Sequence, residues 1–128
     1  MAEIVIDPFP SAEALAQFWH GAWGNELPQN YQAVLARSLG HVGALDGDRL
    51  VGFVNIAGDG GVHAFILDTA VDPAFRRRGL ATELVRVATD LARERGAEWL
   101  HVDFEPHLTA FYRGCGFRPT EAGLIRLR

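Results

Sequence analysis

The stretch LDTAVDPAFRRRGLATELVRVA, residues 67–88, decides the fold of this 128-residue chain. An apolar run closes at Pro73, a run of arginines and Gly79 follow, and a helical pattern begins at Leu80. The apolar residues of that pattern recur at the spacing of a single helix face, namely Leu80, Leu84, Val87, Ala88 and Leu91. The stretch therefore predicts a strand, a loop and an amphipathic helix in succession.

The junction between this strand and this helix has unusual electrostatics. Residues 76–78 are arginines, although a helix N-terminus carries partial positive charge and favours anions. No Ser, Thr, Asp or Asn stands where a capping side chain is expected, so the first backbone N–H groups need other partners. Gly79 lets the backbone approach a ligand closely or take positive φ. These features predict an anion site for a diphosphate over residues 76–82, with a solvated basic turn as the alternative.

The rest of the chain predicts a sheet around this unit. Strands are expected at residues 3–6, 41–45, 50–57, 62–71, 98–104, near 117 and at 124–128, and helices at 11–23, 29–39, 80–95 and 108–113. Residues 62–71 are almost continuously apolar, which predicts a strand covered on both faces. The strand, helix and strand across residues 62–104 predict a right-handed crossover with parallel strands.

Composition narrows the function classes. Hydrophobic residues make up 48% of the chain and the net charge is -4, which predicts one globular domain over residues 1–128 and argues against a nucleic-acid binder. Cys115 is the only cysteine and is expected to be a small buried side chain. No signal peptide, membrane-spanning run or metal motif is visible. We expect a soluble cytoplasmic protein with no metal and no membrane partner.

Two motifs resemble those of a known family. Residues 67–88 resemble the acetyl-CoA-binding motif of the GNAT acetyltransferase superfamily, V-D-P followed by [QR]-x-x-G-x-[GA], here with Arg76, Gly79 and Ala81. AFYRGCGF, residues 110–117, is similar to that family's F-Y-x-x-x-G-F element. The resemblance covers roughly residues 4–128. It implies an α/β (α+β) fold with a mixed, mostly antiparallel sheet of about six or seven strands, a splayed parallel pair and about four helices.

The resemblance also implies roles for individual residues. Backbone N–H groups of the loop are expected to hold the pyrophosphate of acetyl-CoA, over Arg76, Arg77, Arg78, Gly79, Leu80, Ala81 and Thr82. The strand before the loop is expected to bulge and to pair its end, Thr69, Ala70 and Val71, with the pantetheine amides. Tyr112 matches the family's general acid, which protonates the thiolate of coenzyme A as it leaves.

The general base is left open by the sequence. The family often places a Glu or His in the middle of the strand at 62–71, but the inner positions there are apolar. Glu105 stands where the family often has an Asn, and it is our candidate catalytic base or acceptor-binding group. The other candidates are His101, Asp103, Asp68, His63 and a water relay. For His63 an ordinary surface role is preferred. By strict alternation, the Asp68 side chain lies on the face of the sheet opposite to that of His63, unless a bulge in the strand changes its direction.

The expected function is N-acetyl transfer from acetyl-CoA to an amine by direct attack in a ternary complex. The alternative is a CoA-binding or acyl-CoA-binding regulatory module with little or no turnover. The acceptor, a small molecule or a peptide amine, is not identified by the sequence, although Trp23 and Tyr31 could wall its pocket. The last predicted strand, residues 124–128, could pair across a homodimer.

Overall fold

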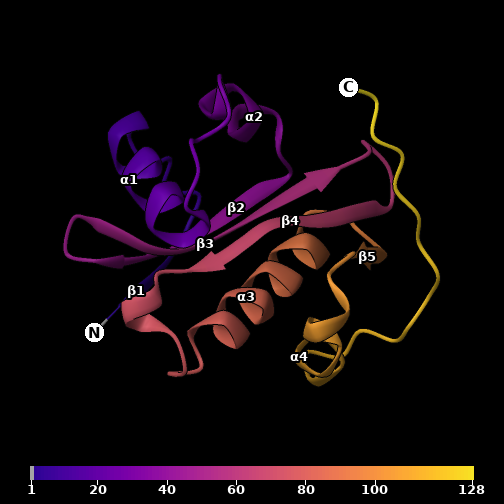
Figure 1. The fold of residues 1–128 in the computed structure, drawn as a ribbon. Helices are drawn as coiled ribbons and strands as arrows, with labels where there is room; N and C mark the ends of the chain where they lie inside the picture. Colours follow the sequence, from indigo (N-terminus) through magenta and orange to yellow (C-terminus); the bar gives the residue numbers. More distant parts are fainter. Residues whose placement is uncertain (1) are drawn as a thin grey trace.

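The computed structural model describes residues 2–128 and builds them around one five-stranded sheet in the order β1-β2-β3-β4-β5 (Figure 1). The strands are β1 (Glu3–Ile6), β2 (Gly40–Asp46), β3 (Arg49–Gly58), β4 (His63–Val71) and β5 (Trp99–His101). The first four pair antiparallel, and β5 lies parallel to β4. The parallel pair confirms the predicted crossover through the helix that joins these two strands.

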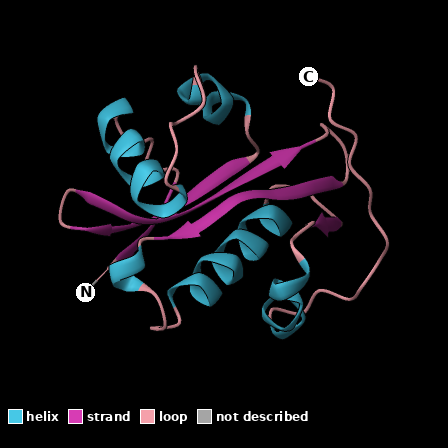
Figure 2. Cartoon of the chain, in the orientation of Figure 1, coloured by secondary structure: helices cyan, strands magenta, loops and turns pink. Residues whose placement is uncertain are grey.

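Helices cover both faces of this sheet (Figure 2). One face carries α1 (Ala12–Trp23) and α2 (Tyr31–Arg37), and the other carries α3 (Leu80–Glu94) and α4 (Thr109–Gly114). Short 3-10 turns, η1 (Pro73–Phe75) and η2 (Pro106–Leu108), precede α3 and α4. The mixed α/β class and the four helices agree with the expectation from the sequence.

The strand count differs from that expectation of about six or seven. Residues 117–128 form no helix or strand, so the strands predicted near 117 and at 124–128 are absent, and the strand predicted for residues 98–104 is only three residues long. Leu124, Ile125 and Leu127 are 85–88% exposed at the end of the chain. An alternating pattern can favour a strand, but the strand forms only where a neighbour takes its N–H and C=O groups.

Two apolar clusters hold the layers together. The larger lies between the sheet and α3, whose Leu84, Val85, Ala88, Leu91 and Ala92 are buried there. The smaller lies under α1 and α2, where Phe53 of β3 meets Leu15, Phe18, Trp19, Tyr31 and Leu35. Each fully buried large apolar side chain contributes roughly 1.5–3 kcal/mol. Ser11 caps α1 by accepting the Ala14 N–H at 3.1 Å, as the sequence predicts.

One expectation about β4 is wrong. Ala64 and Ile66 are buried against α3, but Phe65 and Leu67 on the opposite face are 38% and 43% exposed. The strand is therefore covered on one side only along this stretch. Because α2 is only seven residues long, it leaves that face of the sheet open at β4 and β5 (Figure 1).

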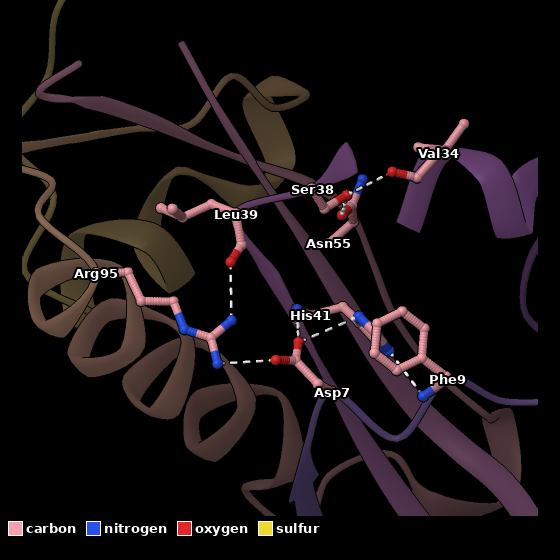
Figure 3. A network of polar contacts seen from close by, with 8 residues as sticks. All are labelled: Asp7, Phe9, Val34, Ser38, Leu39, His41, Asn55 and Arg95. Atoms are coloured by element: carbon pink, nitrogen blue, oxygen red, sulfur yellow. Dashed lines mark hydrogen bonds and ion pairs between the residues drawn. The ribbon is translucent and has the colours of Figure 1, made fainter. Parts of the chain in front are cut away.

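A buried polar network fixes the connection between β1 and α1 (Figure 3). His41 of β2 is fully buried, and its Nε2 accepts the Phe9 N–H at 3.0 Å. Asp7 Oδ1 accepts the His41 backbone N–H at 2.9 Å and lies 3.4 Å from His41 Nδ1. Arg95, at the end of α3, contacts Asp7 Oδ2 at 2.8 Å and donates to the Leu39 carbonyl at 2.8 Å. The network therefore ties β1, β2 and α3 together.

Candidate active site

A bulge in β4 redirects its second half. Phe53 of β3 lies opposite Ala70, but Asn55 lies opposite Leu67, so β4 carries one extra residue between these pairs. Asp68 takes up the extra length with a left-handed φ of 58°. The Tyr31 hydroxyl donates to Asp68 Oδ2 at 2.8 Å, so the bulge turns this carboxylate toward α2. Burial, and then the Asp68 charge and hydrogen bond, raise the pKa of Tyr31 far above its ordinary value.

The parallel pair separates early. β4 and β5 pair only from His63 opposite Trp99 to Phe65 opposite His101, while β4 runs on to Val71. Within residues 2–128, no strand pairs with β4 beyond Phe65 on this side. The Thr69 hydroxyl lies in this unpaired half, buried beside the Tyr112 phenol, and it makes no hydrogen bond of normal geometry in the described chain. Such a buried polar group indicates a place where a ligand can supply the missing partner.

The loop after β4 is held by ionic and capping contacts. Asp72, which is almost fully buried, accepts the Ala74 N–H at 2.9 Å and meets Arg49 at 2.6 Å. The Arg76 Nε donates to the Val71 carbonyl at 3.0 Å. Arg76 is thus turned back onto the end of β4, and its side chain helps to shape the loop.

The start of α3 is bare, as the sequence predicts. Gly79 is the N-cap in a left-handed conformation, φ 78°, and no side chain caps the helix. Arg77 is also left-handed, with φ 63°, and both Arg77 and Arg78 are exposed. The Arg78 guanidinium lies 5.1 Å from the centre of the Phe75 ring. Uncapped N–H groups beside two exposed cations form a suitable anion site.

Tyr112 of α4 is enclosed by aromatic rings. Phe104 stacks on it at 4.7 Å between ring centroids, and Phe111 and Phe117 meet it edge-on at 4.9 and 5.8 Å. Burial raises the pKa of Tyr112, which outweighs the lowering effect of the neighbouring Thr69 hydroxyl. The phenol therefore stays protonated at neutral pH, as a proton donor must. The sequence singled out Tyr112 but not Phe104, whose role depends on the turn after β5.

The acidic candidates after β5 are more remote. Asp103 and Glu105 are exposed and lie beyond the end of the strand. Glu105 precedes η2, where its carbonyl accepts the Leu108 N–H at 2.9 Å and its side chain caps nothing. Within residues 2–128, no hydrogen bond or ion pair joins the Glu105 carboxylate to Tyr112.

Two histidines meet where the strands begin to separate. His63 Nδ1 lies 2.8 Å from His101 Nε2, although the two residues are 38 positions apart. The Phe65 ring stacks on His101 with centroids 4.5 Å apart. Sequence reasoning weighed these histidines separately and missed the pair, because their contact depends on the register of the parallel strands. Residues 2–128 contain no cluster of three or more potential metal ligands.

One cavity lies away from Tyr112. It has a volume of about 620 Å³ and opens between the exposed side of α1, at Ala16 and His20, and residues 25–33. Tyr31 lines it, whereas Trp23 is exposed and lies 6.2 Å from Trp19 between ring centroids. Trp23 does not line this cavity, so Trp23 and Tyr31 do not form one wall of it together. Among the described helices, none is both long and apolar enough to span a membrane.

Relatives share parts of this chain. It is 40% identical over 58 residues to the probable glucosamine 6-phosphate N-acetyltransferase 2 of Oryza sativa subsp. japonica, covering 45% of this chain and 35% of that protein. The alignments span between 22% and 55% of the length of the curated relatives that it matches. The chain thus corresponds to only part of each of those proteins.

Solved structures share the whole fold. A GNAT family acetyltransferase from Streptococcus pneumoniae superposes with a TM-score of 0.82 at 25% identity, covering 100% of both chains. An aminoglycoside N-acetyltransferase in complex with CoA superposes with a TM-score of 0.76 at 18% identity, covering 100% of this chain and 96% of that one. The family model described as the acetyltransferase (GNAT) family matches residues 2–117. The open β4 edge, the bare start of α3 and the enclosed tyrosine thus lie on the scaffold of a chain that belongs to the GNAT acetyltransferase family.

Proposed function

We propose that this protein transfers the acetyl group of acetyl-CoA to an amine by direct attack in a ternary complex. The observation that carries the proposal is the unpaired half of β4, which has a bare helix start at one end and Tyr112 beside Thr69. Family membership and the CoA complex of a fold neighbour support the choice of cofactor. The single domain expected over residues 1–128 remains part of the same proposal.

The residues present fit acetyl-CoA at both ends. Backbone N–H groups over residues 76–82 would bind the diphosphate, with Arg77 and Arg78 adding charge that Arg76 does not supply from its place on Val71. The end of β4, from Thr69 to Val71, would pair with the amides of the pantetheine arm as an added strand does. The buried Thr69 hydroxyl lies on this path.

Tyr112 would act on the leaving group. The amine nitrogen attacks the thioester carbonyl carbon, the carbon–sulfur bond breaks, and the phenol proton passes to the sulfur. The ordinary pKa values of a thiol, about 8.5, and of a phenol, about 10, are close enough for this transfer once the phenol is held in place. Burial raises the pKa of Tyr112 above the ordinary phenol value, so the phenol gives up its proton only as negative charge develops on the sulfur. The aromatic enclosure of Tyr112 by Phe104 and Phe111 holds the ring in place.

The acceptor side is open to several amines. Glu105 remains our proposed acceptor-side carboxylate, as base or as ligand for the ammonium group. A small-molecule amine or a peptide amine fits the open face of β4. The protein would act as a monomer or as a homodimer. The rival function is a CoA-binding regulatory module, favoured by the apolar middle of β4.

Two measurements test the proposal. The first is release of free CoA thiol from acetyl-CoA with a panel of D-glucosamine 6-phosphate, kanamycin, tyramine and a lysine peptide, for the wild type and Tyr112→Phe. We expect turnover with at least one amine and a loss of about 10²-fold or more in kcat for the variant. CoA binding without acetylation of any amine would favour the regulatory module.

The second measurement is CoA affinity by calorimetry. Arg77→Gln with Arg78→Gln is expected to weaken binding about 10²-fold or more, because the two lost charged contacts to phosphate are together worth about 3 kcal/mol or more. Arg37→Gln on the exposed side of α2 removes the same charge far from the loop and is the matched control. Equal affinity in all three proteins would place the diphosphate elsewhere.

A further inference from the structure

The His63–His101 contact joins two ring nitrogens at the last rung of the parallel pair. The nitrogens lie 2.8 Å apart, and Phe65 stacks against His101 on the same face of the sheet. His63 is half-buried, and His101 is exposed. The proposed binding of the cofactor and protonation of the leaving group involve neither ring, so they do not explain this polar contact on an open face of the sheet.

The pair lies at the far end of the open stretch of β4 that would hold a bound thioester. The diphosphate site lies after Val71, and β4 runs from there past Thr69, beside Tyr112, to the rung where Phe65 faces His101. With the sulfur at Tyr112, four residues of β4, roughly 13 Å at about 3.3 Å per residue, separate the thioester from that rung. No described strand pairs with β4 on this side between the two points, so an acceptor amine and a bridging water would lie between the thioester and His101.

We propose that His101 and His63 together accept the proton that the amine must lose, with His101 taking it from the ammonium group through a bridging water and His63 passing the charge to solvent. The inference rests on the proposed acetyl transfer and names the proton acceptor of that reaction. In these terms His101 is the proton acceptor and His63 acts through it.

The proton count balances in a relay. The contact uses His63 Nδ1 and His101 Nε2, and it leaves His101 Nδ1 and His63 Nε2 as the outer nitrogens. With both rings starting as Nε2–H, the bridging water takes the ammonium proton and gives one to His101 Nδ1, the His101 Nε2 proton moves to His63 Nδ1, and the His63 Nε2 proton leaves to solvent. Both rings end as Nδ1–H, and exchange with water restores the starting tautomers.

Imidazole chemistry suits this task better than the nearby carboxylates do. Imidazole is the side chain that ordinarily exchanges protons near neutral pH, which is where a general base is most effective. Asp68 Oδ2 already accepts the Tyr31 hydroxyl, and Glu105 lies beyond the end of β5. Asp59 also contacts the pair, because its Oδ1 accepts the His63 backbone N–H at 3.2 Å.

A first experiment tests the shared proton without any acceptor. Long-range nitrogen–proton NMR of the imidazoles is recorded against pH for the wild type, His63→Gln and His20→Gln. Because two N–H groups cannot face each other, the contact requires both neutral rings to have the same tautomer. For the same reason, the pair should take up its two protons in separate steps. In His63→Gln, His101 is expected to titrate in one step at a shifted pH. Identical His101 titrations in wild type and His63→Gln would overturn the relay.

A second experiment measures kcat/KM against pH with the panel amine that gives the highest rate. His101→Gln is expected to lower kcat/KM at neutral pH about 10²-fold or more while CoA affinity stays unchanged. The deficit should shrink as pH approaches the pKa of the amine, about 10, because free amine then needs no base. Added imidazole should restore part of the activity of His101→Ala. His63→Gln should show a smaller loss with the same pH trend, and His20→Gln on the exposed side of α1 is the matched control.

The outcomes separate the two proposals. A wild type that acetylates amines and depends on Tyr112, with His101→Gln as active as His20→Gln, overturns the relay and leaves the acetyltransferase intact. Loss of the pH-dependent limb in Glu105→Gln or Asp68→Asn, with the histidine variants unaffected, assigns the base to that carboxylate. Absence of acetylation by the wild type overturns both proposals.

Discussion

His41 provides a quantitative prediction, because it is fully buried and its proton-binding nitrogens are occupied or close to Asp7 (Figure 3). Burial lowers the pKa of His41 below 6.5, the Asp7 charge partly opposes this, and the Arg95 charge adds to it. Protonation of Nε2 would also cost the hydrogen bond from Phe9. The unfolded chain therefore binds this proton more readily than the folded protein does.

The sign and size of the effect follow from linkage. Because the unfolded state binds more protons below pH 6.5, the free energy of unfolding falls as pH falls through this range. The slope from His41 is at most about 1.4 kcal/mol per pH unit. Relative to pH 8, the loss is at most about 1.4 kcal/mol at pH 5.5 and about 2 kcal/mol at pH 5.0.

Asp7 adds to this loss only at lower pH. Burial alone would raise the pKa of Asp7, but hydrogen bonds and charges from Arg95 and His41 lower it below 3.8. A carboxylate with a lowered pKa stabilises the fold above 3.8, and this contribution is lost as pH falls through the folded value. The window from pH 8 to pH 5 therefore isolates His41 from Asp7.

Urea unfolding of the wild type, His41→Gln and His20→Gln at a series of pH values between about 8 and 5 measures the effect. Gln can still accept the Phe9 N–H but does not titrate, so the difference between wild type and His41→Gln should shrink by up to about 1.4 kcal/mol on acidification to pH 5.5. His20→Gln, on the exposed side of α1, should follow the wild type. Parallel profiles for wild type and His41→Gln would refute the argument that burial excludes the proton.

Three further predictions concern the fold around the site. Gly79→Ala should lower the free energy of unfolding by about 1 kcal/mol, because a side chain strains the left-handed φ of 78° at this position. Gly114→Ala, equally open but without positive φ, should not lower it, and equal urea midpoints for the two variants would contradict this. Phe53→Ala should cost about 3–5 kcal/mol in a urea titration and the exposed Val34→Ala below 1 kcal/mol, and similar losses for both would show that Phe53 is not a core residue. Asp72→Ala should weaken CoA binding in calorimetry, because the loop loses its cap and ion pair, and unchanged affinity would show that these contacts do not shape the loop.

Much of the cofactor side follows from local sequence. The bare helix start at Gly79 depends on residues within one turn, and a short window carries all the information needed. The same holds for α1, which begins after Ser11 and ends at Gly24 in a left-handed conformation. The final strand at residues 124–128 was not predicted correctly, because its formation requires a neighbouring edge that no local pattern contains.

The acceptor side depends on tertiary structure. Strict alternation assigns side chains to faces, but one extra residue in β4 breaks the alternation and turns Asp68 toward Tyr31. His63 and His101 meet only because a crossover sets the register of two strands that are distant in sequence. The sequence by itself thus determined the family and the uncapped start of α3, and it singled out Tyr112 as the candidate acid, because all of these are encoded in contiguous residues. The tertiary structure decided which side chains Asp68 and the two histidines meet along β4, because those contacts depend on register, bulge and strand separation.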